Sequence, residues 1–304
     1  IEKNEDHGTF IDLYRTQDGV VKHKLLSKYD NKPILEHPID PKRKDKDGVI
    51  QVWEFPPPNR QTYGVYWAGI DIVASSVSNT SPSLNSIHIY KGSHNLSDEY
   101  TEDRIVAKFM SRTSDKMDFY KKAMLLLEWY NAEALIENNI TWFIEEAIKS
   151  KEQFRLARNP QWARDITPQG ISHINRPYGV LSGVKLIDKM IEAISSYIKE
   201  PTYVTYDENT GEPTQHYGVE RIRDLQLLRE LINYRPKKEY EKGNYDAVFS
   251  FGLALLHAKN SEVLGIIPED TKENVNFNQK NAKLMLRSRF SHTNLKKLSN
   301  ANNI

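Results

Sequence analysis

The chain contains no cysteine among its 304 residues. This absence excludes disulfide bonds, a thiol nucleophile, and zinc or iron–sulfur sites ligated by cysteine. No apolar run approaches ~18 residues, so no segment is predicted to cross a bilayer as a helix. Positive and negative charges nearly cancel, with 42 Lys and Arg against 41 Asp and Glu. This balance argues against a protein that coats nucleic acid through bulk charge, although it permits local basic patches.

Several motifs of well-known catalytic sites are also missing. The chain has no Gly-Lys dipeptide, and therefore no phosphate-binding P-loop, and it has no His-Glu-x-x-His zinc motif. It also lacks the Gly-x-Ser-x-Gly nucleophile elbow, although spacing alone leaves a Ser-His-Asp arrangement open. Because the chain begins at Ile1 without a methionine, we expect it to be a piece of a longer protein.

The residues that are present are typical of a folded globular protein, with 38% hydrophobic and 10% aromatic side chains. We divide the chain into a β-rich lead-in segment over residues 1–62, a core over 63–260 and a basic C-terminal tail over 261–304. Within the tail, residues 274–304 carry six Lys and Arg and no acid. This pattern indicates either a solvated tail or an arm that binds nucleic acid or a partner.

The first half of the core predicts a sheet. Residues 65–73 form a continuous apolar run, which is typical of a strand buried on both faces. Strands at 86–91 and 103–109 are expected to follow in antiparallel succession. A helix capped within 113–115 then leads to a fourth strand at 132–137. Because a crossover helix places the fourth strand beside the first and parallel to it, we predict an α/β fold with a mixed central β-sheet flanked by helices.

The second half of the core is predicted to be mainly helical, after a short strand around residues 154–156. We expect Ser182 to cap a helix whose apolar face comprises Ile187, Met190, Ile191, Ile194 and Ile198. A second helix is expected to bury Ile222, Leu225, Leu228 and Ile232. Between these helices, residues 203–217 resemble a hairpin with its turn at 209–211. Residues 247–258 are apolar on nearly all sides and predict a buried helix.

Three carboxylates are candidates for catalysis or metal binding because of their positions in the predicted elements. Asp71 ends the first strand, Glu137 ends the fourth, and Asp246 opens the buried final helix. Parallel neighbouring strands would bring two of these acids to one rim, and a docked helix N-terminus would add the third. Such acids repel one another unless cations intervene, and oxygen ligands favour Mg²⁺ or Mn²⁺. Each acid also has a simpler interpretation: a strand end, a surface acid, or an acid favoured by the helix dipole.

Four segments of the core resemble a known family: residues 66–71, 128–139, 221–234 and 244–255. The family is the C-terminal nuclease domain of the large terminase subunits that package DNA in tailed bacteriophages. The first segment is similar to the family's first strand with its first metal-binding aspartate. The second resembles the segment that carries the second acid, and the last two resemble the helix before the third acid and the block around it. Residues 48–56 also resemble the lead-in of a large-terminase subset, that of crAss-like phages.

This resemblance implies an RNase H-like fold and an endonuclease domain that cuts concatemeric double-stranded viral DNA. Its catalytic and metal-binding residues would be Asp71, Glu137 and Asp246, with two Mg²⁺ or Mn²⁺ ions as cofactors. The implied partners are double-stranded DNA, the portal and the small terminase subunit. An ATPase motor domain would lie outside this chain, and the protein would work in the host cell cytoplasm without a membrane.

Three basic residues are candidates for DNA contact. Lys185 stands where some relatives have a lysine near the site, although an exposed helical lysine is its simpler interpretation. Arg287 and Arg289 belong to the basic tail. Two rival functions remain: another RNase H-like nuclease, such as a junction resolvase, or a non-catalytic module that docks a motor to DNA or to the portal.

Overall fold

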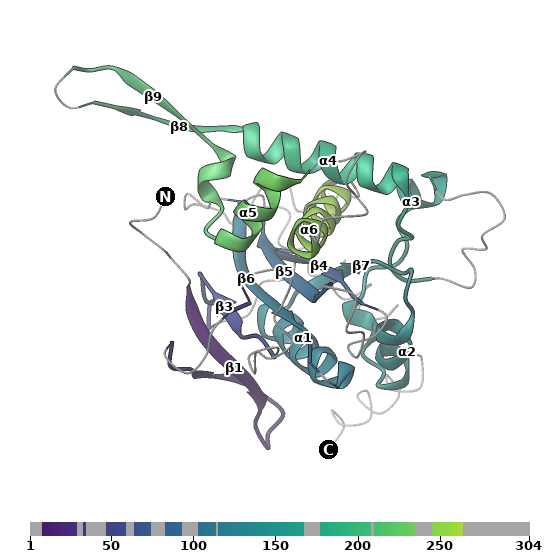
Figure 1. Cartoon of the computed structure of the whole chain (residues 1–304). Coiled ribbons are helices and arrows are strands. Elements are labelled where there is room, and N and C mark those ends of the chain that lie inside the picture. Colours follow the sequence, from purple (N-terminus) through teal and green to yellow (C-terminus); the bar gives the residue numbers. More distant parts are fainter. Residues whose placement is uncertain are drawn as a thin grey trace, which may run out of the picture.

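The computed structural model describes residues 8–28, 33–34, 47–58, 64–73, 83–92, 103–113, 115–166, 177–207, 210–234 and 245–263. A mixed seven-stranded sheet in the order β2-β1-β3-β6-β5-β4-β7 forms its centre (Figure 1). Its strands are β1 Thr9–Arg15, β2 Val21–Leu25, β3 Ile50–Val52, β4 Tyr66–Asp71, β5 Asn85–Lys91, β6 Arg104–Ser111 and β7 Glu133–Ile136. The helices are α1 Lys116–Tyr130, α2 Trp142–Lys149, α3 Gln161–Ile166, α4 Val184–Lys199, α5 Leu225–Asn233 and α6 Asp246–Val263.

The pairing of the central strands follows the prediction. β4, β5 and β6 are successive antiparallel neighbours, and β7 lies parallel to β4 on its other side. The α/β class with a mixed sheet flanked by helices is therefore confirmed. The lead-in strands β1 to β3 extend the same sheet, because β3 pairs with β6 through Ile50 opposite Phe109.

Two hydrophobic cores lie on the two faces of this sheet. On one face, α1 and α2 pack through aromatic side chains, with Phe119 stacked on Phe109 of β6 at a ring-centroid distance of 5.5 Å. On the other face, α6 covers β4 and β5, and α4 packs on α6, where Tyr197 of α4 meets Phe251 of α6 edge to face. The buried, nearly all-apolar character predicted for residues 247–258 is confirmed.

The helix before β7 is bounded by local signals that the sequence carries. The side chain of Asp115 accepts a hydrogen bond from the backbone amide of Met117 at 2.8 Å, as an N-cap does. Asn131 ends α1 in the left-handed conformation, with φ at 52°. The cap expected within residues 113–115 is thus Asp115. Together these two residues define where α1 begins and ends.

Three predictions for residues 153–199 differ from the structure. Residues Gln153–Arg155 form a short 3-10 helix, and Leu156 makes only an isolated bridge to Ala134. Ser182 does not cap α4, whose N-cap residue is Gly183 and lacks a side-chain cap bond. The buried face of α4 is also rotated from the expected one. Met190 and Ile194 are buried as predicted, but the other buried residues are Leu186, Ala193 and Tyr197, whereas Ile187, Ile191 and Ile198 are only partly buried.

The buried face of α5 differs most from the prediction. Ile232 is 65% exposed, whereas the polar residues Gln226 and Glu230 are buried together with Leu227. The polar side chains are buried because they have partners: Gln226 donates to Glu230 at 3.2 Å, and Glu230 accepts from the first turn of α6. The hydrogen bonds of these polar side chains therefore decide which face of α5 is buried, and the spacing of its apolar residues does not.

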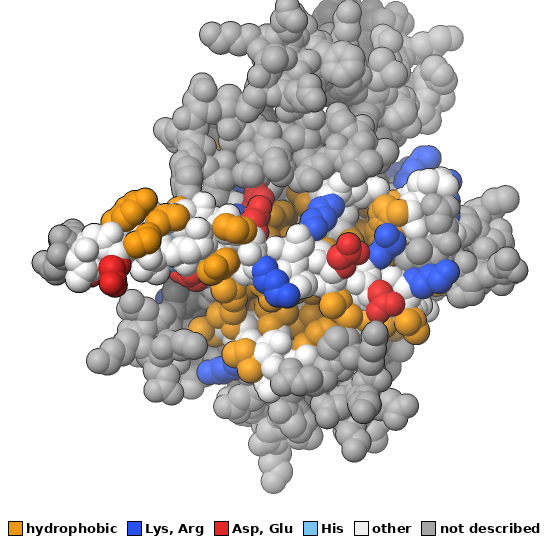
Figure 2. Space-filling model, turned by 90° about the horizontal axis from the view of Figure 1, so that it is seen from above, with side chains coloured by type: hydrophobic (Ala, Val, Ile, Leu, Met, Phe, Trp, Pro, Cys, Tyr) orange, Lys and Arg blue, Asp and Glu red, His pale blue; other side chains and the backbone are white. Residues whose placement is uncertain are grey.

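A two-stranded hairpin projects beyond the C-terminal end of α4 (Figure 1), as the sequence predicts. Its strands are β8 Pro201–Tyr206 and β9 Pro213–Tyr217. Seen from above, hydrophobic side chains lie open along this hairpin (Figure 2), among them Tyr206. Within the described ranges, no helix has the length and apolar character needed to span a membrane.

Candidate active site

Asp71 and Glu137 lie side by side at one end of the sheet. Ile70 of β4 is in register with Ile136 of β7, and the amide of Glu137 donates to the carbonyl of Ile70 at 3.0 Å. Since side chains alternate along a strand, Asp71 points to the same face as Gly69. That face is the one covered by α6, so the predicted convergence of the two strand-end acids is present.

Helix α6 brings Asp246 to the same place. A Cβ atom on Gly69 would lie 1.9 Å from the carbonyl oxygen of Ser250, so only glycine lets α6 pack so closely on β4. Asp246 lies one helical turn before Ser250 and thus beyond the end of β4. Its Oδ2 atom accepts a hydrogen bond from the backbone amide of Leu84 at 2.6 Å, which fixes the carboxylate next to the start of β5.

The electrostatics of Asp71 indicate that the three acids interact. Burial raises the pKa of Asp71 well above its ordinary value. The charges of Glu137 and Asp246 raise this pKa further, as does a hydrogen bond to Glu137. Asp71 and Asp246 are only 9% and 7% exposed, and Glu137 is half-buried. Buried carboxylates this close together need a proton or a cation to offset the repulsion between their charges.

A fourth acid, Glu230 of α5, joins this cluster and was missed by the sequence analysis. Its Oε2 atom accepts hydrogen bonds from the amides of Ala247 and Val248 at 2.9 and 3.1 Å. Burial and the charge of Asp246 raise the pKa of Glu230 to about 8. The one local signal was the four-residue spacing from Gln226, which places both polar side chains on one helical face.

The chemistry of these side chains fits a hard divalent cation, because carboxylate oxygens are the ligands that Mg²⁺ and Mn²⁺ prefer. The like charges around Asp71 repel one another, and a cation bound between them would reduce this repulsion. In the described part of the chain, however, no three acidic or histidine side chains are arranged around one point as metal ligands. The hydrogen bond between Asp71 and Glu137 occupies oxygens that a cation would use.

Lys185 lies near this end of the sheet but outside the acid cluster. It is exposed in the first turn of α4, just after Ser182, whose amide donates to Asn139 Oδ1 at 3.0 Å. The outer surface of α4 carries both basic and acidic side chains (Figure 2), not a continuous basic strip. The other two predicted DNA contacts, Arg287 and Arg289, lie outside the described residues, as does the whole 274–304 segment.

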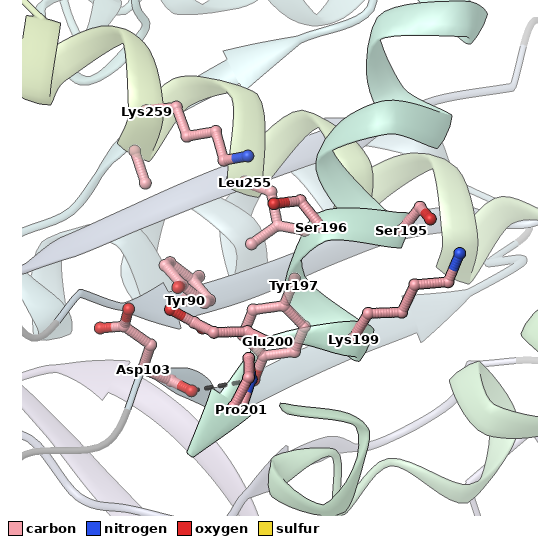
Figure 3. A pocket seen from close by; sticks show the side chains of 11 residues that line it. Tyr90, Asp103, Ser195, Ser196, Tyr197, Lys199, Glu200, Pro201, Leu255 and Lys259 are labelled. Carbon is pink, nitrogen blue, oxygen red and sulfur yellow. Dashed lines mark hydrogen bonds between the residues drawn. The ribbon is translucent and has the colours of Figure 1, made fainter. Parts of the chain in front are cut away.

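A separate pocket of about 570 Å³ opens at the opposite end of the sheet (Figure 3). Lys199 from α4 and Lys259 from α6 line it, and the hydroxyl of Tyr197 donates to the carbonyl of Asp103 at 2.8 Å. The pocket lies where β5 ends and β6 begins, whereas the acids lie where β5 begins. It therefore plays no part in the chemistry of the acid cluster.

Comparison with known proteins finds neither a family model that matches this chain nor a similar protein among those that are curated.

Proposed function

We propose that this chain is an RNase H-like, metal-dependent endonuclease domain of a viral terminase large subunit, which hydrolyses phosphodiester bonds of double-stranded DNA. The observation that carries the proposal is the convergence of Asp71, Glu137 and Asp246. They come from two strands and a helix that are far apart in the sequence, yet their charges act on one another. The parallel placement of β7 beside β4, next to an antiparallel meander, agrees with an RNase H-like sheet.

Each acid of the cluster would have its own role in the reaction. Two Mg²⁺ or Mn²⁺ ions, held by Asp71, Glu137 and Asp246, would supply Lewis acidity toward the phosphate and a more acidic attacking water. Glu137 is half-buried and is the most exposed of the three acids, so it would be the one most accessible to a substrate. Asp246 is fixed by the amide of Leu84 and would keep its place during the reaction. Glu230 holds the first turn of α6 through two amide hydrogen bonds.

The remaining partners belong to the same proposal. Lys185 would contact DNA phosphate beside the acids, and Arg287 and Arg289 would add contacts from the basic tail. The portal, the small terminase subunit and a separate ATPase motor domain would complete the packaging machine in the cytoplasm of the host cell.

The proposal is tested by incubating the protein with supercoiled plasmid and Mn²⁺. We expect nicked and linear products, and we expect their formation to stop on addition of EDTA. Asp71→Ala and Asp246→Ala should each reduce the rate by at least about 100-fold, because removal of a metal ligand costs several kcal/mol of transition-state stabilisation. Asp188→Ala, which removes an exposed acid of α4, is the matched control and should cut normally.

The same assay separates the rival functions. Full activity in Asp71→Ala would exclude the assignment. A strong preference for branched over linear duplex would favour a junction resolvase. DNA or portal binding without cleavage, lost when residues 274–304 are removed, would favour a docking module.

A further inference from the structure

A chain of buried polar side chains runs beneath the acid cluster, between the sheet and helices α5 and α6. Asp224 Oδ2 lies 2.9 Å from His88 Nε2, and His88 Nδ1 lies 2.7 Å from the hydroxyl of Ser250. The Ser250 hydroxyl also lies 2.7 Å from that of Ser86. Lys108 binds the other oxygen of Asp224. All five residues are at most 1% exposed, so the chain is sealed from solvent.

The hydrogen bonds of this chain are consistent with a neutral histidine. Burial lowers the pKa of His88, which favours the uncharged ring. With its proton on Nε2, the ring donates to Asp224 and accepts from the Ser250 hydroxyl at Nδ1. The charge of Asp224 is then balanced by Lys108, and its Oδ1 atom also accepts from the amide of Gln226 at 3.1 Å. Each member thus has a partner.

The chain joins the elements that carry three buried acids of the site, Asp71, Asp246 and Glu230. Ser86 is the cross-strand partner of Asp71 in the β4–β5 pair. Ser250 lies one turn after Asp246, and its hydroxyl oxygen is 2.8 Å from the backbone carbonyl oxygen of Asp246. Asp224 is the N-cap of α5, the helix that carries Glu230. A displacement of α6 along the sheet would break the chain and move Asp246 away from Asp71.

Burying an ion pair and a histidine costs free energy that an apolar core of the same volume would not require. Buried polar groups of this kind often specify one arrangement of the packed elements. The close packing of α6 on Gly69 limits how far the helix can move, but apolar contacts have less direction than hydrogen bonds. The hydrogen bonds of Ser250 therefore favour one position of α6 along the sheet over neighbouring ones.

We propose that the chain Asp224–His88–Ser250 is a positioning device that fixes the register of α6 on the sheet and so holds Asp246 beside Asp71. These are positioning residues, since they lie beneath the acids and do not reach a substrate. The inference rests on the proposed function only in giving Asp246 a metal-binding role; the register itself is a property of the protein without metal.

The decisive variant is Ser250→Ala in the full chain, and α6 offers a matched control. Ser261 is also buried, and its hydroxyl donates to the carbonyl of His257 four residues earlier at 2.9 Å, the same spacing along the helix as between Ser250 and Asp246. No hydrogen bond from Ser261 to the sheet is found within the described residues. Ser261→Ala therefore removes the same kind of buried hydroxyl from the same helix but leaves the contacts of Ser250 with His88 and Ser86 intact.

The first measurement is hydrogen exchange of residues 245–252 without metal. Ser250→Ala should speed exchange there by at least about tenfold, and Ser261→Ala should leave it unchanged, because only the first opens the start of α6 locally. The same exchange in both variants would overturn the inference. A merely structural hydroxyl would lower the melting temperature in both without this local effect.

The second measurement is Mn²⁺ affinity by calorimetry. Ser250→Ala should weaken binding by about tenfold, as is typical when a group that orients a ligand is lost. Unchanged affinity beside faster exchange would overturn the link between register and Asp246. If the unaltered protein bound no Mn²⁺ while the exchange result held, the proposed nuclease function would fail and the register role would stand.

Discussion

Asp71 and Glu137 are adjacent at the ends of two parallel strands, where the amide of Glu137 donates to the carbonyl of Ile70 at 3.0 Å. This adjacency places like charges together in a buried region, and it raises the pKa of Asp71. The protein without metal therefore carries electrostatic repulsion at the proposed site. Removing one charge should relieve it, and binding a cation should do the same.

Replacing Asp71 with asparagine should accordingly raise the melting temperature of the metal-free protein at pH 7. A gain of about 1 kcal/mol corresponds to a few degrees. Mn²⁺ should raise the melting temperature of the unaltered protein by mass action but not that of the variant. Differential scanning calorimetry with and without Mn²⁺ measures both effects, with Asp188→Asn as the neutral control. A metal-induced gain retained in Asp71→Asn would contradict the account.

Glu230 predicts a pH dependence of stability. Its pKa is raised to about 8, above the unfolded value of about 4.3. When the pKa of a group is higher in the folded protein than in the unfolded chain, the group stabilises the fold fully at any pH below its unfolded pKa. This stabilisation is lost as the pH rises through its pKa in the folded protein. The free energy of unfolding should therefore fall between about pH 4.3 and 8.

Glu230→Gln should flatten this decline, because glutamine accepts the two α6 amides without a charge. Gln226 Nε2 now donates to Glu230 Oε1, and Gln226 Oε1 lacks a partner among the described residues. In the variant Gln226 would turn its amide so that Oε1 accepts from the new amide. Urea denaturation from pH 5 to 8 measures the change. The exposed Glu192→Gln is the control and should follow the unaltered protein. An undiminished slope in Glu230→Gln would show that this carboxyl is not the titrating group.

Gly69→Ala tests the close approach of α6 to β4. The new methyl would meet the carbonyl oxygen of Ser250 at 1.9 Å, so the helix would have to move. We expect a loss of about 1–3 kcal/mol in the free energy of unfolding, as for an overpacked core, together with loss of cleavage. Gly92→Ala would bring its new methyl no closer than 3.6 Å to Trp67, which is an ordinary contact, and should change stability by at most about 0.5 kcal/mol. Equal effects at the two glycines would refute the packing argument.

Lys185→Ala should weaken DNA binding and reduce the slope of affinity against salt concentration by about one phosphate contact. Lys199→Ala removes a lysine at the other end of the same helix and is the matched control. Fluorescence anisotropy with a labelled duplex at several salt concentrations compares the two. Equal losses would indicate a diffuse charge effect and would remove Lys185 from the site.

The sequence predicts the centre of the fold well because local rules decide it. A run buried on both faces at 65–73 and a crossover helix are enough to place Asp71 beside Glu137. The cap of α1 and the buried character of α6 are equally local. Where local pattern and tertiary contacts disagree, the tertiary contacts prevail: Ile232 continues the apolar period of α5 but is exposed.

The parts that could not be predicted depend on partners distant in sequence. Glu230 is buried because the amides at the start of α6 bind it, and no pattern within α5 predicts this contact. Asp224 and Lys108 are charged residues 116 positions apart that meet in the core. From sequence alone, each is expected on the surface. Such pairs become visible only when the sheet and helices are placed in space.

The central claim is most directly tested by anomalous diffraction from crystals soaked in Mn²⁺. The account predicts Mn²⁺ peaks within about 2.0–2.6 Å of carboxylate oxygens of Asp71, Glu137 and Asp246. It also predicts that these peaks disappear in Asp71→Asn crystals. Crystals of the unaltered protein with no anomalous peak at these three carboxylates, at Mn²⁺ concentrations that saturate the activity, would contradict it.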